Sequence, residues 1–326
     1  MATATATANI KYLVLSGGGP VMYSEFFAVK YLVENHFLDL RNIRAAYGTS
    51  AGALVAVFLS LGYELDMVGD FLIQRPWNRL FEKNISGSVI ELFSKKGLFG
   101  SDIIEQTLEP LLSGKDLAVD ITLEEFFEFN GWDIHIISLN LNTMQICDFN
   151  HKSFPKMRLV DAIYASACIP GVFAPFFFQN HYYVDGGLIC NYPLDVCLRA
   201  SGDSSCDSSC DSYGEILGIK VKYHYQADSY CPARDNILAP ECDLTDYFGF
   251  FVRQIITYLD KTPDAKIPYE VEIDMISLVE ENNDEGGCEE TTMTIDDVIM
   301  TVSNCEYRKK LKNIGINSAT KFLQST

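Results

Sequence analysis

A serine between two glycines is the most reactive pattern in this 326-residue chain. Residues 48–52 read G-T-S-A-G, and the flanking Gly48 and Gly52 allow the sharp turn that exposes the Ser50 hydroxyl. If a helix follows, its free N–H groups and dipole favour the anion that forms during acyl transfer. The motif predicts Ser50 as a nucleophile and the Ala51 N–H as an oxyanion donor. A small-residue turn that only lets a helix pack closely is the alternative interpretation.

A carboxylate before two glycines is the candidate base. Asp185 ends an expected strand at residues 181–184 and precedes Gly186 and Gly187, which permit close backbone approach and an exposed carboxylate. A serine nucleophile needs such a partner to take its proton. Taken alone, the same residues could form an ordinary Asp-Gly turn.

A histidine base is disfavoured by chain order. In an α/β-hydrolase with a Ser-His-Asp triad the histidine follows the acid, and His224 is the single histidine after Asp185. It sits in Tyr-His-Tyr at the end of an expected strand, which is typical of a surface or packing histidine. The triad remains an alternative, and it predicts that His224→Ala abolishes activity.

A glycine turn near the N-terminus can bind an anion. Residues 16–20 read S-G-G-G-P, so Gly17, Gly18 and Gly19 offer successive N–H groups at a helix start, for an oxyanion or a phosphate. Nucleotide binding is not supported, because Met22 breaks the G-x-G-x-x-G spacing and no Walker lysine follows.

The elements around these motifs alternate between strand and helix. Apolar patterns predict strands at 12–16 and 43–47, each followed by a glycine turn and a helix, at 26–33 and 53–59. Such alternation predicts a parallel sheet covered by helices.

The remaining chain predicts one continuing α/β domain. Residues 1–9 are expected to be a disordered tail, 10–200 the catalytic core, 201–215 a low-complexity acidic loop, and 216–326 strands and helices that complete the same domain. Within these ranges we expect strands at 133–139, 144–149, 216–223 and 269–276, a helix at 159–168, an extended segment at 170–175 and a second acidic loop at 280–290. Five aromatic residues in the irregular helical region 67–112 are expected to form core, or else the wall of an apolar cleft: Phe71, Trp77, Phe81, Phe93 and Phe99.

The amino-acid composition limits the classes of molecule that this chain could bind. With 44 acidic and 25 basic residues the net charge is −19, which excludes nucleic acid and would repel an anionic lipid surface. Any membrane contact would therefore rest on apolar insertion. The ten cysteines form no C-x-x-C pair, so neither a zinc site nor a redox motif is expected. Residues 1–9 lack the features of a secretory signal and no apolar stretch of about 18 residues occurs, which predicts a cytoplasmic protein, peripheral to membranes, without a transmembrane segment.

Together, the three motifs resemble the patatin-like phospholipase family. Residues 165–175, A-S-A-C-I-P-G-V-F-A-P, are similar to a run that precedes the family's Asp-Gly-Gly, and the resemblance extends over residues 12–191 and more faintly to a closing helix at 315–323. It implies a three-layer α/β/α fold with a mostly parallel central sheet. It also implies a Ser50–Asp185 dyad that hydrolyses acyl esters through an acyl-enzyme, without metal or cofactor, as a phospholipase A or lysophospholipase. The residues of the glycine turn, Gly17 to Gly19, would complete the oxyanion hole, and the substrate would be a lipid at a membrane or lipid-droplet surface.

One departure from the family pattern concerns the glycine turn. The family usually continues it as G-G-G-x-[R/K]-G, whereas this chain has Val21 and Met22 at the last two positions. The missing cation predicts weaker anion stabilisation or an uncharged substrate. A catalytically weak lipid-binding or scaffolding protein is therefore the alternative to an active hydrolase.

Overall fold

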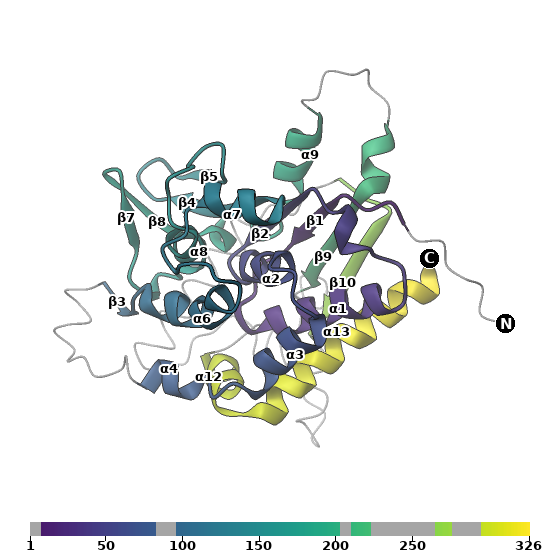
Figure 1. Cartoon of the computed structure of the whole chain (residues 1–326), viewed down its shortest axis with the longest axis horizontal. Helices are drawn as coiled ribbons and strands as arrows, with labels where there is room; N and C mark the ends of the chain where they lie inside the picture. Colours follow the sequence, from purple (N-terminus) through teal and green to yellow (C-terminus); the bar gives the residue numbers. More distant parts are fainter. Residues whose placement is uncertain (1–7, 83–95, 203–209, 223–264, 276–294) are drawn as a thin grey trace, which may run out of the picture.

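A mixed β-sheet forms the centre of the protein, which we describe from a computed structural model covering residues 8–82, 96–202, 210–222, 265–275 and 295–326 (Figure 1). Its strands run in the order β10-β9-β1-β2-β4-β8-β7, and β5 also pairs with β4. The pairs among β10, β9, β1, β2 and β4 are parallel, and those of β5, β8 and β7 are antiparallel. The strands are β1 (Tyr12–Leu15), β2 (Ala45–Thr49), β4 (Asp133–Asn140), β5 (Gln145–Phe149), β7 (Phe176–Phe178), β8 (His181–Asp185), β9 (Ile216–Lys222) and β10 (Tyr269–Asp274), while β3 (Gly97–Phe99) and β6 (Gly171–Phe173) pair separately.

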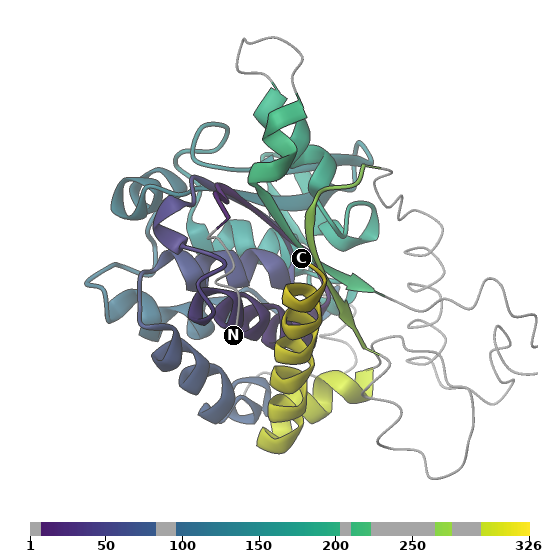
Figure 2. The same cartoon turned by 90° about the vertical axis from the view of Figure 1, so that its right-hand side faces the viewer.

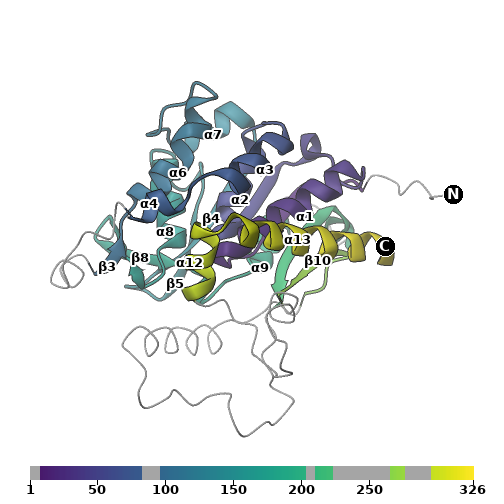
Figure 3. The same cartoon turned by 90° about the horizontal axis from the view of Figure 1, so that it is seen from below.

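Helices flank the sheet on both faces. α1, α2, α8 and α13 pack on one face, where α1 and α13 lie side by side, and α9 packs on the other face against β1 and β2 (Figures 2 and 3). None of the described helices has the length and apolar character needed to cross a bilayer. The α-helices are α1 (Met22–Glu34), α2 (Ala51–Ser60), α3 (Leu65–Gln74), α4 (Asn78–Glu82), α6 (Asp102–Ser113), α7 (Leu123–Asn130), α8 (Leu159–Ala167), α9 (Leu194–Gly202), α12 (Ile295–Ser303) and α13 (Cys305–Ser325).

Side-chain alternation along the strands builds two cores. In β1, Leu13 and Leu15 belong to the large core under α1 and α2, whereas Val14 points to a smaller core under α9 that includes Tyr47 and Leu194. A strand buried on both faces reads as a continuous apolar run, which is why β1 and β2 could be recognised in the sequence. The predicted three-layer fold with a mostly parallel sheet is confirmed.

Some predicted boundaries differ from the structure. β2 begins two residues later than expected, because the 3₁₀ turn Leu40–Asn42 and the Ile43–Arg44 link precede it. At the N-terminus, the Ala8 N–H donates to the Phe37 carbonyl at 3.1 Å, so the tail predicted over 1–9 is anchored at residue 8. In the segment predicted as loop 201–215, α9 extends to Gly202 and a 3₁₀ helix covers Cys210–Glu215.

Several expectations fall on residues outside the described ranges. These are the tail at 1–7, the low-complexity segment 203–209, the second acidic loop at 280–290, Phe93 and His224. Of the other predicted aromatic core residues, Trp77 is buried, and Phe71, Phe81 and Phe99 are half-buried.

Candidate active site

Two strands end head to head along one edge of β4. β2 is parallel to β4 and pairs Thr49 with Ile137, while β8 is antiparallel and pairs Asp185 with Ser138. β5 pairs with residues 136–140 of β4, which include residues that also pair with β2 and residues that also pair with β8. Because each residue of β4 has one neighbour on each side, β5 lies along one edge of β4, and β2 and β8 lie along the other. The C-terminal ends of β2 and β8 therefore meet, and the residue that follows Thr49 lies beside Asp185.

The turn after β2 holds Ser50 in an unusual backbone conformation. Its φ is 51° and its ψ is −115°, and α2 begins at the next residue, Ala51. Such a conformation is strained for a non-glycine residue and is characteristic of functional turns. The flanking glycines are sterically required: a Cβ on Gly48 would lie 2.5 Å from the Ala53 nitrogen, and one on Gly52 would lie 2.4 Å from the Leu15 carbonyl oxygen.

Ser50 and Asp185 are in direct contact. The Ser50 hydroxyl donates to Asp185 Oδ2 at 2.7 Å, and Asp185 Oδ1 accepts from the Gly187 N–H, also at 2.7 Å. Both side chains are buried. Gly186 permits this approach, because a Cβ there would lie 2.4 Å from the Ile137 carbonyl oxygen. The structure thus joins two predicted motifs that lie 135 residues apart.

Burial gives Asp185 a basicity suited to proton transfer. Removal from water raises the pKa of Asp185 to about 6, against the opposing effect of the hydrogen bonds from Ser50 and Gly187. An ordinary aspartate is a poor base near neutral pH, and a raised pKa brings the carboxylate closer to the working range of a general base.

The glycine turn lies against the serine and offers N–H groups. A Cβ on Gly17 would lie 3.4 Å from Ser50 Cβ, and Gly19 has a φ of 51° that favours glycine. The Gly17 N–H, however, donates to the Asn191 carbonyl at 2.9 Å. The expectation that all three glycines serve as oxyanion donors therefore needs correction, because this hydrogen bond occupies Gly17. Within the described part of the chain, the N–H groups of Gly18, Gly19 and Ala51 have no hydrogen-bond acceptor.

Val21 and Met22, which replace the family's basic residue and glycine in the glycine turn, are packed against the core. Val21, which stands at the position of the family's basic residue, is fully buried in the large core, and Met22 begins α1 half-buried. The side chain at position 21 thus contributes packing to this turn.

A buried carboxyl group supports the glycine turn from α1. The Ser16 hydroxyl donates to Glu25 Oε1 at 2.9 Å and accepts from the Val221 N–H at 3.0 Å. Burial raises the pKa of Glu25 well above its usual range, against the hydrogen bonds from Ser16. The sequence analysis did not identify this group, because Glu25 shows no pattern that distinguishes it from a surface residue of α1.

Ser166 on α8 fixes the backbone of the nucleophile. Its hydroxyl accepts from the Ser50 N–H at 2.8 Å and donates to the Ile137 carbonyl. The Ser50 N–H is consequently unavailable to a substrate. The sequence analysis placed Ser166 in the 165–175 segment but gave it no role, and its position in that motif was the signal that could have identified it.

Ser166→Ala is expected to lower both stability and turnover. It leaves the buried Ser50 N–H and Ile137 carbonyl without their partner, at a cost of about 1–3 kcal/mol in the free energy of unfolding, and it releases the strained turn. Chemical denaturation and ester-hydrolysis rates measure the two effects. Ser24→Ala is the matched control, since Ser24 is equally buried and its hydroxyl donates to the Leu311 carbonyl away from Ser50. An equal loss of turnover in both variants would contradict the role of Ser166.

No histidine within the described ranges is hydrogen-bonded to Ser50 or Asp185. His135 points to the opposite face of the sheet, where it stacks on Tyr47 and contacts Asp148 at 2.7 Å. Burial opposes its protonation, but the hydrogen bonds to Asp133 and Asp148 raise the pKa of His135 to about 9. His135 is therefore a charged packing residue. His224, the predicted triad alternative, lies outside the described residues.

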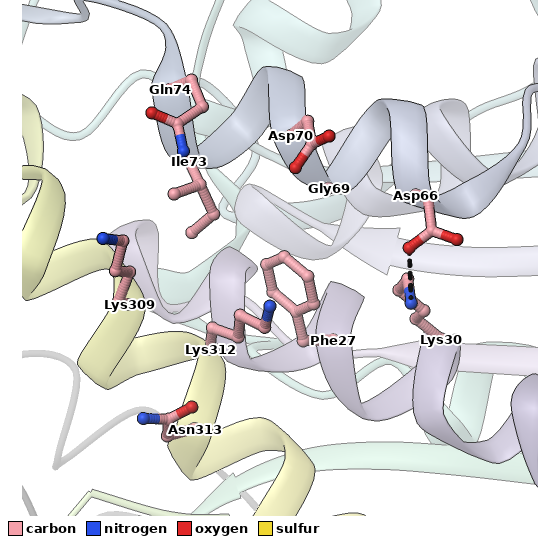
Figure 4. A pocket seen from close by; sticks show the side chains of 10 residues that line it. All are labelled: Phe27, Lys30, Asp66, Gly69, Asp70, Ile73, Gln74, Lys309, Lys312 and Asn313. Carbon is pink, nitrogen blue, oxygen red and sulfur yellow. Dashed lines mark ion pairs between the residues drawn. The ribbon is translucent and has the colours of Figure 1, made fainter.

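A surface pocket of about 260 Å³ lies between α1, α3 and α13 (Figure 4). Two of its lysines are engaged with neighbours: Lys30 pairs with Asp66 at 3.1 Å, and the Lys312 ammonium lies 4.9 Å from the centre of the Phe27 ring. None of the Ser50, Asp185 or glycine-turn residues lines it. The pocket is thus distinct from the candidate active site.

The chain is similar in sequence and in fold to several known proteins. The family model described as patatin-like phospholipase matches residues 13–198. The chain is 28% identical to uncharacterized protein R571 of Acanthamoeba polyphaga mimivirus and 27% identical to probable lipid hydrolase 463L of Invertebrate iridescent virus 6. These matches cover 57% and 58% of this chain and 61% and 63% of those proteins, so the chain matches just over three-fifths of either relative. VipD from Legionella pneumophila shares the fold, with a TM-score of 0.52 and 15% identity over 98% of this chain and 68% of that chain.

Proposed function

The chain belongs to the patatin-like phospholipase family, and on that premise we propose that it is a lipid acyl-ester hydrolase in which Ser50 and Asp185 form the catalytic dyad. The observation that carries this proposal is the hydrogen bond of 2.7 Å from the Ser50 hydroxyl to Asp185 Oδ2 in a buried, strained turn. The relative named as a probable lipid hydrolase supports the lipid class of substrate. We propose a phospholipase A or lysophospholipase type of reaction at a membrane or lipid-droplet surface.

The geometry of Ser50 and Asp185 supports the following acylation step. Ser50 Oγ attacks the ester carbonyl carbon while its proton passes to Asp185 Oδ2. The N–H groups of Gly18, Gly19 and Ala51 stabilise the oxyanion, and the Ala51 amide also lies at the positive end of α2. When the tetrahedral intermediate collapses, the alcohol leaves with the proton from Asp185 and the acyl group remains on Ser50.

Deacylation uses the same two residues in reverse. The oxygen of a water molecule attacks the acyl-enzyme carbonyl carbon while Asp185 takes a proton from that water molecule. The carbon–Oγ bond then breaks, Ser50 recovers the proton from Asp185, and the fatty acid is released. The hydrogen bond from the Gly187 N–H holds the carboxylate in place throughout.

A panel of lipid substrates tests the proposal. Purified protein is incubated with phosphatidylcholine, lysophosphatidylcholine and triacylglycerol, and fatty-acid release is measured with Ser50→Ala as control. We expect release from the phospholipid or the lysophospholipid by the wild type alone. Equal release by both proteins, or none by a folded wild type, would refute the proposal.

The pH dependence should report Asp185. Because Asp185 accepts a proton only when ionised and its pKa is raised to about 6, kcat/KM should fall about tenfold per pH unit below 6 and reach a plateau above it. A pH-rate profile on a soluble ester measures this. Glu25→Gln is the control, because it removes the other buried carboxyl group near the turn and should leave the inflection in place. An inflection near pH 4, or one that disappears in Glu25→Gln, would contradict the assignment.

Burial of Val21 favours a second candidate, a catalytically weak lipid-binding protein. Without a cation in the glycine turn, the oxyanion would depend on backbone N–H groups alone. A fluorophosphonate that labels Ser50 separates the two candidates, because a binding protein has no need to activate that hydroxyl.

A further inference from the structure

Four large apolar side chains are exposed on two neighbouring β-hairpins. Leu141, Met144 and Ile146 lie on the β4–β5 hairpin with 40%, 56% and 39% of their surface exposed, and Phe177 on β7 is 56% exposed. We call these four residues the apolar rim. In an ordinary surface such side chains are scattered, so their concentration on two hairpins indicates a binding surface.

The strand register places the strand residues of the rim on one face of the sheet. Leu139 pairs with both Ile146 and Val184, and Phe177 pairs with Tyr182. Directly paired residues, and residues two apart on one strand, share a face, so Ile146 and Phe177 point the same way. Phe176 and Phe178 point to the opposite face, where they pack against Tyr164 and Phe154 and anchor β7.

Hydrogen bonds join the two hairpins into one unit. The Leu141 N–H donates to the Tyr182 carbonyl at 2.9 Å, and the Tyr182 N–H donates to Asn142 Oδ1 at 2.8 Å. Asn140 Oδ1 accepts from the N–H groups of Asn142 and Thr143, which satisfies the tip of the β4–β5 hairpin. Polar backbone groups satisfied in this way can leave water at lower cost than free ones.

The rim lies at the same end of the sheet as the dyad and projects further outward. Asp185 pairs with Ser138, whereas Tyr182 lies three residues before Asp185 in β8 and its carbonyl accepts from the Leu141 N–H. At about 3.3 Å per residue, the hairpins project about 10 Å past the level of Ser50 and Asp185. Asp185 pairs with Ser138 and so points to the opposite face from Leu139 and Ile146, which means that a surface touching the rim would lie beside the end of the sheet that carries the dyad.

The charge pattern indicates what that surface is. Residues 134–147 and 162–184 contain no Asp, Glu, Lys or Arg, although the chain has 44 acidic residues and a net charge of −19. A neighbouring charged side chain, Lys96, is basic, with its ammonium 5.5 Å from the centre of the Tyr182 ring. Asp148, two residues from Ile146 on β5, is paired with His135 at 2.7 Å. A largely uncharged apolar surface on an acidic protein suits insertion into an electrically neutral lipid interface rather than an anionic one.

We propose that the apolar rim inserts into a neutral lipid surface and thereby holds the end of the sheet that carries the dyad beside that surface. The inference rests on the proposed function for the identity of the substrate, but binding can be measured without catalysis. Because apolar burial drives the contact, it should be insensitive to salt.

Vesicle flotation of the full chain tests the proposal. Ser50→Ala protein is mixed with phosphatidylcholine vesicles at about 0.1 M and about 0.5 M NaCl, which compares weak with strong screening of charge. We expect partition at both salt concentrations, and at least a tenfold loss in the additional double variant Met144→Asp with Phe177→Asp. The matched control is Ile299→Asp with Met300→Asp on α12, whose side chains are 53% and 41% exposed and which should partition like the parent.

A fluorescent variant tests the rim without relying on the double variant, which could misfold. Phe177→Trp keeps an apolar aromatic ring at the site, so it should bind as the parent does and its emission should shift to shorter wavelength on vesicles. Thermal unfolding checks that every variant is folded.

Three results would overturn the proposal: no flotation of the parent, equal loss in the α12 control, or a rim variant that floats normally. If the rim variant instead converts a dimer to a monomer while the parent does not float, a second copy covers the rim and the lipid assignment is wrong. Hydrolysis of a water-soluble ester by the wild type separates this inference from the proposed function. A protein that hydrolyses the ester but does not float refutes only the rim, and one that floats without hydrolysing any ester refutes only the proposed function.

Discussion

Ser50→Ala is expected to reduce ester hydrolysis by about a thousandfold or more, because it removes the oxygen that would form the acyl-enzyme. The substitution deletes one hydroxyl from a side chain whose main interaction is the hydrogen bond to Asp185. The Ser50 N–H retains its bond to Ser166, so the turn should persist. Steady-state rates on a soluble ester measure the effect.

The control for this variant is Ser60→Ala at the end of α2, the helix that begins directly after Ser50. Ser60 is also buried, and its hydroxyl donates to the Val57 carbonyl inside α2, away from the dyad. It should retain turnover. Substantial hydrolysis by folded Ser50→Ala protein would mean that another group is the nucleophile.

Asp185→Asn is expected to reduce hydrolysis by about 10²–10⁴-fold, the usual contribution of a general base. The amide has the shape of the carboxylate and its oxygen can still accept from the Gly187 N–H, but it cannot take the Ser50 proton. Rates on the same soluble ester measure the loss, and wild-type turnover by the variant would remove Asp185 from the mechanism.

The same variant should not lose stability at neutral pH. The folded-state pKa of Asp185 is raised from 3.8 to about 6, so ionisation costs the folded state stability as the pH rises through this interval. Above pH 6 the full cost is present, about 3 kcal/mol on this shift. Asn avoids it, so Asp185→Asn should unfold at the wild-type temperature or higher at pH 7.5, and the difference should vanish at about pH 4. If Asp185→Asn were markedly less stable than the wild type, its inactivity would be explained by misfolding.

The reactive motifs and the elements around them could be predicted because they are local. The apolar runs of β1 and β2, the glycine turns and the helix after Ser50 each depend on a few adjacent residues. The family pattern then supplied the link between Ser50 and Asp185. The fold class followed from the alternation of strands and helices.

The supporting groups could not be predicted, because they depend on contacts between distant segments. Ser166 lies 116 residues from Ser50, and the Gly17 N–H is occupied by Asn191, 174 residues away. The antiparallel direction of β8, which lets its end meet the end of β2, has no local signature either. These contacts decide which N–H groups remain free for an oxyanion.

The most direct test of the dyad is covalent labelling by a fluorophosphonate at pH 7.5, followed by peptide mass spectrometry. The reagent reacts with a serine whose hydroxyl is activated by a base, so the account predicts an adduct on Ser50 in the wild type and strongly slowed labelling in Asp185→Asn. A folded wild type that remains unlabelled, or that carries the adduct on another residue, would contradict the assignment of Ser50 and Asp185 as the catalytic pair.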